Sequence, residues 1–216
     1  ATFGKRDHIA LLNLFEQLVS IRPNTKLLIC GKTPKIKIKE HLKSNIHSTG
    51  YLSREGVFQH LKCSDIFLQF SMGKGGVCNK SGSLAAAFAA GLPIVGNKGD
   101  MTNQSLIESG AVIFAPKKGH ANMDALLEIM DNPILLEQQA ERAELYHERF
   151  LDWRIISNPT TLTRLYIYES ISRILAVYCF CPFCQMVLCL PDKRNVRRAN
   201  SPTHNAIAGR NWSSRY

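Results

Sequence analysis

The chain has 216 residues, of which 45% are hydrophobic, and its formal net charge is +10 at pH 7. This length suffices for one large domain or for a domain with an appendage, and the composition supports an ordinary hydrophobic core. No apolar run approaches the roughly 20 residues that a bilayer-spanning helix needs, and no secretory signal follows the first residue, so we expect a cytoplasmic fragment.

Much of the excess positive charge lies in two places. The final stretch holds Lys193, Arg194, Arg197, Arg198, Arg210 and Arg215, opposed there only by Asp192. Because much of the basicity belongs to this tail, we do not expect nucleic acid as the main partner. A second group favours a solvated face, with attraction of an anionic ligand or membrane surface as the alternative. It consists of Lys32, Lys35, Lys37 and Lys39.

The cysteines indicate reduced thiols. Their number, seven, is odd, and Cys30, Cys63 and Cys78 lie in apolar or loop contexts. We therefore predict no disulfide framework.

The first third of the chain predicts helices and strands in alternation. Residues 1–6 look like the end of a strand and the loop after it, and Asp7 opens a helix whose apolar residues recur at helical spacing as far as Ile21. The elements that we expect next are a strand at 26–30, a short helix at 34–43, a strand at 45–49, a helix at 53–62 and a strand at 65–70.

The central stretch, Ser71–Gly96, combines a glycine loop with an Ala-rich helix that begins at Gly82 and ends before a second strand, Ile94-Val95. The loop glycines are Gly73, Gly75 and Gly76, and the candidate helix caps are Ser81 and Ser83. Free N–H groups at such a helix start would form an anion site, and phosphate is the usual anion. Tight turns and close helix–sheet packing explain the same small residues, and the fixed nucleotide fingerprints are missing, so both interpretations stay open.

The second half continues the alternation. We expect a helix at 104–109 capped by Thr102 or Asn103, a strand at 111–115, and helices at 122–130, 133–150 and 161–177. Strands and helices that alternate over short connections predict an α/β fold with a Rossmann-like, doubly wound parallel sheet. Ligands of such sheets bind at the carboxyl ends of the strands, where the glycine loop lies.

The C-terminal part predicts an extension of this fold. We divide the chain into a Rossmann-like domain at 1–156, a helical and Cys-rich apolar extension at 157–190 and a basic, disordered tail at 191–216. Four cysteines in the extension invite a zinc interpretation; they are Cys179, Cys181, Cys184 and Cys189. The standard spacing of two C-x-x-C pairs is absent, because only Cys181 and Cys184 form such a pair, and apolar residues surround the thiols. We therefore predict no structural metal, and we expect this segment to pack against the body or a partner domain.

Several motifs, in their order and spacing, resemble the C-terminal, donor-binding half of a GT-B glycosyltransferase of the retaining class, glycosyltransferase family 4. They are Phe3-Gly4-Lys5-Arg6, Ser64–Leu68 running into the glycine loop, Gly82–Ala87, Ala90–Val95 and Phe150–Trp153. The resemblance spans residues 1 to about 155. It implies a single Rossmann-like half that binds a nucleoside diphosphate sugar as substrate and uses no cofactor. It also implies a partner, the acceptor-binding half that precedes this one in the family.

The resemblance assigns phosphate binding to two motifs. Lys5 and Arg6 match a basic pair that neutralises the donor phosphates, with a solvated loop charge as the alternative. Gly82 and Ser83 match the helix start whose amides meet the distal phosphate. We therefore expect the Lys5-Arg6 loop to meet the Gly82 helix start at the carboxyl edge of the sheet.

The resemblance assigns contacts with the donor sugar and the base to three further motifs. Gly75 and Gly76 match the loop that faces the donor sugar, and plain turn glycines are the alternative. Lys80 lies close by and offers a substitute contact. Tyr51 and Leu52 match the stretch that lies against the nucleotide base, and ordinary edge packing is the alternative.

One departure from the family concerns a pair of glutamates separated by seven residues. These would fall at Cys78 and Ala86, where no carboxylate is present. In the family the first contacts the donor sugar and the second hydrogen-bonds the ribose. No catalytic residue is therefore assigned. The leading hypothesis is the donor-binding half of a glycosyltransferase. The alternatives are a catalytically inactive nucleotide-binding domain and a basic adaptor for nucleic acid or an anionic membrane.

Overall fold

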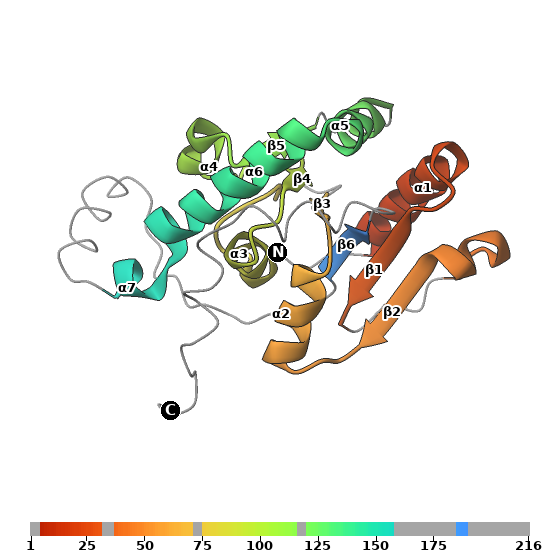
Figure 1. Ribbon diagram of the computed structural model, residues 1–216, viewed down its shortest axis with the longest axis horizontal. Coiled ribbons are helices and arrows are strands. Elements are labelled where there is room, and N and C mark those ends of the chain that lie inside the picture. Colours follow the sequence, from red (N-terminus) through yellow and green to blue (C-terminus); the bar gives the residue numbers. More distant parts are fainter. Residues whose placement is uncertain (1–4, 32–36, 71–74, 116–119, 158–184, 190–216) are drawn as a thin grey trace.

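Figure 1 shows the computed structural model, a sheet with helices packed around it. The structure describes residues 5–31, 37–70, 75–115, 120–157 and 185–189. Its elements are α1 (Lys5–Ile21), β1 (Lys26–Cys30), η1 (Glu40–Asn45), β2 (Ile46–Gly50), α2 (Arg54–Lys62), β3 (Ile66–Gln69), α3 (Gly82–Ala89), β4 (Ile94–Gly96), α4 (Gln104–Ser109), β5 (Val112–Phe114), α5 (His120–Asp131), α6 (Pro133–Tyr146), η2 (His147–Leu151), α7 (Trp153–Ile156) and β6 (Gln185–Cys189). Of these, η1 is a 3-10 helix and η2 a π-helical turn.

The described strands form one sheet in the order β2-β1-β6-β3-β4-β5. The pairs β1–β2, β3–β4 and β4–β5 are parallel, whereas β6 is antiparallel to both of its neighbours. This is the doubly wound order 3-2-1-4-5-6 with β6 in the place of strand 1. In that order strand 1 is parallel to its neighbours and leads into the first helix. Here the position is filled from the far end of the described chain, in the opposite direction.

Helices cover both faces of the sheet, as a doubly wound fold requires. One face packs against α1 and α5, and Figure 1 shows these two helices on the same side. The apolar residues of α1 repeat at helical spacing to form its buried stripe, namely Leu11, Leu14, Phe15 and Leu18. The other face packs against α2, α3 and α4. Helix α6 contributes Leu136 to the first core cluster and Tyr146 to the second, so it spans both layers.

The prediction of a Rossmann-like α/β fold is confirmed, but three predicted boundaries are wrong. Helix α1 begins at Lys5, so Lys5 and Arg6 lie in its first turn and not in a loop, because nothing between Lys5 and Asp7 opposes helix formation. In place of a helix at 34–43, the structure has the 3-10 helix η1 from Glu40, whose last residue, Asn45, donates from Nδ2 to Pro23 O and Thr25 O at 2.7 and 2.9 Å. Residues 32–36 lie outside the described structure. The α-helix that begins at Pro133 ends at Tyr146, and the π-helical turn follows.

The Cys-rich segment contributes a strand to the centre of the sheet. Leu188 of β6 is fully buried, and the Asp65 N–H donates to Leu188 O at 2.9 Å. Cys189 lies in β6, while the other three cysteines, the predicted helix at 161–177 and the tail at 191–216 lie outside the described residues. Among the described residues, no group of three or more His, Cys, Asp or Glu side chains is arranged to hold a metal ion. None of the described helices is long and apolar enough to cross a membrane.

Candidate functional site

The carboxyl ends of the parallel strands define one edge of the sheet. Tyr51 follows β2 at this edge, and Phe70 and Asn97 follow β3 and β4. Because β6 is antiparallel, it begins here, with Gln185 opposite Cys30. In open α/β sheets, ligands bind outside this edge at the point where the strand order reverses, which here lies between β6 and β3.

The start of α3 lies at this edge and is open. Ser81 is the N-cap, one of the two predicted caps, and its hydroxyl accepts from the Leu84 N–H at 3.3 Å. The N–H groups of Gly82 and Ser83, by contrast, donate to no acceptor within the part of the chain that the structure describes. A Cβ built on Gly82 would meet no heavy atom of the described residues within 4 Å. Two amides without acceptors at the positive end of a helix, with space beside them, form an anion-binding arrangement.

The glycine loop before α3 is held against the loop after β4. Gly76 has a left-handed φ of 64°, and a Cβ there would overlap the backbone of Gly99. The Met101 N–H donates to Gly75 O at 3.2 Å, and the Val77 N–H donates to Asn97 O at 3.0 Å. Backbone conformation and close approach therefore account for glycine at position 76 without a ligand. Contact of Gly75 and Gly76 with a donor sugar stays a prediction.

A hydrogen-bonded group that the sequence analysis missed fixes Asn79, between this loop and α3. The Asn79 N–H donates to Asn103 Oδ1 at 2.9 Å, and Asn79 Nδ2 donates to the Tyr146 hydroxyl at 2.8 Å. Asn103 is the N-cap residue of α4, but its side chain does not cap that helix, contrary to expectation, because its oxygen is committed to Asn79. No local pattern could have revealed this group, since its members are far apart in the sequence.

The remaining predicted positions are distributed around the same edge. The Tyr51 side chain is 65% exposed, Leu52 packs against the core of the α2–α3 face, and Lys80 is exposed. Helix α1 ends next to the start of β1, at the opposite edge, so its first turn with Lys5 and Arg6 lies toward the carboxyl edge. The side chains of Lys5 and Arg6 lie outside what the structure describes. Their contact with phosphate, and that of the other predicted residues with base and sugar, stay predictions.

The two positions that lack the family's glutamates are both covered by protein. Cys78 is 1% exposed, and its carbonyl accepts from the Ser81 N–H at 3.1 Å. Ala86, on α3, packs partly buried against the core. A carboxylate at position 78 would be buried in this loop conformation, which is costly unless the charge is paired. The loop as folded therefore suits a thiol better than a carboxylate.

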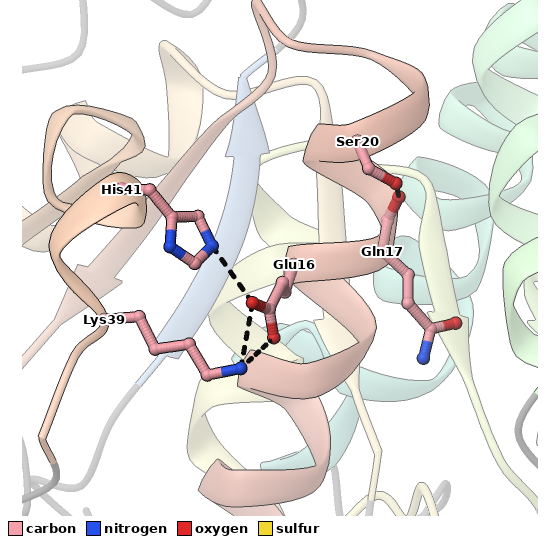
Figure 2. Close-up of polar contacts among 5 residues, drawn as sticks. All are labelled: Glu16, Gln17, Ser20, Lys39 and His41. Atoms are coloured by element: carbon pink, nitrogen blue, oxygen red, sulfur yellow. Dashed lines mark hydrogen bonds and ion pairs between the residues drawn. The ribbon is translucent and has the colours of Figure 1, made fainter.

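Lys39 of the second basic group and the nearby Lys43 pair with acidic residues at the opposite, amino edge, and Figure 2 shows the pair of Lys39. Lys39 Nζ lies 2.9 and 2.6 Å from the two carboxylate oxygens of Glu16 in α1, and His41 Nε2 lies 3.0 Å from Glu16 Oε1. The hydrogen bond from Lys39, together with the nearby charges of Lys39 and His41, lowers the pKa of Glu16. Lys43 pairs with Glu40 at 2.6 Å. These ion pairs neutralise part of the charge that could attract an anionic surface.

The fold places the chain among Rossmann-like α/β domains of the GT-B kind. A crystal structure of WaaG, a glycosyltransferase involved in lipopolysaccharide biosynthesis, matches with a TM-score of 0.54 and 18% sequence identity, over 79% of this chain and 44% of that chain. A structure of a protein assigned as a UDP-N-acetylglucosamine 2-epimerase, from Listeria monocytogenes, matches with a TM-score of 0.46 and 18% identity, over 76% of this chain and 42% of that chain. At these identities the first similarity shows the fold alone, and the second is too distant to carry an argument. This chain thus spans less than half the length of either structure.

The family follows from the sequence match. The profile of the family described as glycosyl transferases group 1 matches residues 4–132, which is more than half of the chain. The chain therefore belongs to the group 1 glycosyl transferases. No curated protein matches the chain in sequence.

Proposed function

We propose that this chain is the donor-binding portion of a retaining glycosyltransferase, which transfers a sugar from a nucleoside diphosphate sugar to an acceptor hydroxyl. The observation that carries the proposal is the start of α3 at the carboxyl edge, where the Gly82 and Ser83 amides lie at the positive end of the helix dipole and no described residue fills the space beside Gly82. A diphosphate is the part of such a donor that this arrangement suits. Membership of the glycosyl transferase family supplies the reaction class.

In this proposal the chain contributes charge stabilisation and positioning. The amides of Gly82 and Ser83 hold the distal phosphate and stabilise the diphosphate as it departs, and Lys5 and Arg6 neutralise its charge. Lys80 and the Gly75-Gly76 loop face the donor sugar. The base lies against Tyr51 and Leu52, of which the exposed Tyr51 ring offers a stacking surface. The acceptor and the residues around its hydroxyl belong to the acceptor-binding half, and no metal or cofactor is required.

A second candidate function is a catalytically inactive nucleotide-binding domain of the same fold. It is favoured by the buried Cys78 thiol and the Ala86 methyl group at the positions where the family carries its two glutamates. Without these carboxylates the phosphate site persists, but the hydrogen bonds to ribose and donor sugar are lost. Such a domain would bind a free nucleoside diphosphate about as tightly as the corresponding nucleotide sugar.

The phosphate site can be tested with Gly82→Pro, which removes one proposed donor and leaves the fold intact. Gly82 is the first residue of α3, where proline is favoured, and Ser81 before it has φ −82° and ψ 109°, a conformation that proline accepts in its predecessor. Calorimetric titration with uridine, guanosine and adenosine diphosphates, with and without attached sugars, measures the effect. Loss of the amide should weaken binding by about 1 to 3 kcal/mol. Gly82→Ala is the matched control, because it retains the N–H and adds a similar steric change at Cβ.

Two results would contradict the proposed site. The first is full affinity in Gly82→Pro, and the second is the absence of binding to any of the diphosphates by the parent chain. Equal affinity for a nucleotide and its sugar conjugate would favour the inactive domain. We also expect the chain alone to give no transfer to an acceptor, and at most slow donor hydrolysis, because one half of the cleft cannot hold donor and acceptor together. Multiple-turnover glycoside formation from a labelled nucleotide sugar would contradict that expectation.

A further inference from the structure

We infer that Tyr146, at the end of α6, is a positioning residue that fixes the Val77–Ser81 loop and thereby the open start of α3. The consequence for ligand binding rests on the proposed function, whereas the consequence for the loop does not. Figure 1 shows α6 passing from α5 to the neighbourhood of α3, so its last residue can reach a loop that is remote in the sequence.

Asn79 is the loop residue through which Tyr146 acts. Its side chain meets the Tyr146 hydroxyl with both polar atoms, Nδ2 at 2.8 Å and Oδ1 at 3.1 Å. Its backbone N–H is held separately by Asn103 Oδ1 at 2.9 Å. Main chain and side chain are therefore tied to two different helices, α6 and α4, which leaves Asn79 little rotational freedom.

The single proton of the Tyr146 hydroxyl determines which of its contacts are hydrogen bonds that it donates. The Tyr146 hydroxyl has one proton and accepts from Asn79 Nδ2, so that proton goes either to Asn79 Oδ1 or to the Ser105 hydroxyl, which lies 2.9 Å away. In either case the Asn79 amide keeps at least one hydrogen bond to Tyr146. Ser105 lies in the first turn of α4, and the hydroxyl therefore joins the loop, α4 and α6 at a single point.

The Tyr146 ring cannot follow a moving loop. It is 2% exposed and packs against two other rings, with its centroid 4.9 Å from that of Phe88 in α3 and 4.7 Å from that of Phe150 in the π-helical turn. Side chains that are closely packed in a core change rotamer at a cost, so the hydroxyl is a fixed point. A buried ring that presents its only polar atom to a loop suits a positioning role.

The short path from Asn79 to α3 transmits this restraint. Only Lys80 separates Asn79 from the cap Ser81, and the Ser81 N–H closes the turn by donating to Cys78 O at 3.1 Å. Rotation of Asn79 would change this turn and the direction of the Gly82 and Ser83 amides. The helix determines the spacing of those amides, but the loop that Tyr146 restrains determines the direction of their N–H bonds.

The test is Tyr146→Phe, which removes the hydroxyl and retains the ring stack. Amide hydrogen exchange measures the loop at Asn79, whose N–H bond to Asn103 depends on the loop conformation, and measures the core at Ile94 and Val95 of β4. We expect exchange at Asn79 to rise about 2- to 10-fold while exchange in β4 stays at the parent rate, as expected for loss of one hydrogen bond. The dissociation constant for uridine diphosphate or the best-bound diphosphate should rise by a similar factor.

Two further variants distinguish positioning from a general structural role. In an Asn79→Ala background, Tyr146→Phe should have no additional effect on exchange at the Ser81 amide, which donates to Cys78 O in the same turn, because both changes remove the same contact. Ser105→Ala is the matched control, since it removes a partner of the same hydroxyl and leaves both contacts to Asn79. Its exchange at Asn79 should stay within about 2-fold of the parent.

The inference is overturned if Tyr146→Phe leaves Asn79 exchange unchanged, if it raises β4 exchange equally, or if its effect adds in full to that of Asn79→Ala. These readouts need no ligand. If the parent chain bound no diphosphate at all, the proposed function would fail while the exchange data still decided the role of Tyr146.

Discussion

β3 and β6 are neighbouring strands in the sheet. Local sequence signals specify the position of β3, whereas pairing with remote strands specifies that of β6. β3 belongs to a local unit, β3–α3–β4, whose parts are adjacent in the sequence and carry their own signals: a buried apolar run, the Ser81 cap and the helix stop at Gly91, with φ 66°. β6 comes from a segment far along the chain, pairs with two strands that it does not adjoin in sequence, and runs against both.

The difference shows that a sheet position can be specified separately from the segment that fills it. With β6 removed, β1 and β3 would face each other across a gap about 10 Å wide, the space of one strand. Both facing edges carry unpaired N–H and C=O groups, and a short apolar strand satisfies them in either direction. The position between β1 and β3 is thus defined by these two strands and by helix α1, which packs over them. β6 fills it with hydrogen-bonding backbone groups and one buried side chain.

The largest expected effect tests whether β6 belongs to the core as fully as β3 does. Leu188→Ala and Leu68→Ala each delete a buried side chain from the same core cluster, and each should lower the free energy of unfolding by about 2 to 5 kcal/mol. Urea denaturation measures both. Leu145→Ala, at an exposed position of α6, is the control and should change stability little. A full loss for Leu68→Ala beside a negligible loss for Leu188→Ala would show that β6 is not part of the folded core.

A second, smaller effect separates two glycines of the local unit. Gly76→Ala forces a left-handed φ on a residue with a Cβ that meets the Gly99 backbone, and should cost about 1 to 3 kcal/mol of stability. Gly82→Ala introduces a Cβ that meets none of the described residues within 4 Å and should cause no loss. Thermal and urea unfolding of the two variants give the comparison. Equal losses would mean that the start of α3 is covered in solution.

The helix cap is a third local signal. Ser81→Ala removes the oxygen that accepts from the Leu84 N–H and should cost about 0.5 to 2 kcal/mol. Ser83→Ala leaves that bond in place and should cost less, although the two hydroxyls lie 2.9 Å apart. If Ser83→Ala were the more damaging change, the cap would have been assigned to the wrong serine.

The smallest expected effect concerns the charge at the start of α7, at the far end of the locally specified region. Hydrogen bonding from the Arg154 side chain is the main cause that lowers the pKa of Asp152 from its ordinary 3.8 to about 2. The folded state therefore favours the ionised carboxylate, so this contribution is present above about pH 4 and is lost as the pH falls toward about 2.

Asp152→Asn tests that contribution, because asparagine still caps the helix but carries no charge. At pH 7 the variant should lose less than about 1 kcal/mol, since the Arg154 partner is largely exposed. Urea unfolding at several pH values should show the difference between parent and variant shrinking below about pH 4. A difference that grew in acid would contradict the assigned direction of the pKa shift.

The sequence by itself determined the elements whose signals are local. The strand at Lys26–Cys30, the helix from Gly82 stopped by Gly91 and the helix from Gln104 ended by Gly110 were predicted close to their observed bounds. Alternation of such elements was enough to predict the doubly wound fold, and the order of motifs was enough to predict the glycosyl transferase family. The elements and their alternation depend on propensities, caps and periodicity, which operate within a few residues along the chain. The family, by contrast, was predicted from the resemblance of the motifs to those of known glycosyltransferases.

Only the tertiary structure decided which remote segments complete the sheet and hold the site. That Gln185–Cys189 fills the central position in reverse, and that Tyr146 meets Asn79, follow from edges and cavities that exist only once other elements have packed. The sequence of an apolar strand does not indicate its neighbour or its direction in the sheet, because its backbone hydrogen-bonding groups are the same for any neighbour. The partners of a tyrosine hydroxyl likewise depend on which residues the fold brings next to it. The positioning role of Tyr146 therefore cannot be predicted from the local sequence.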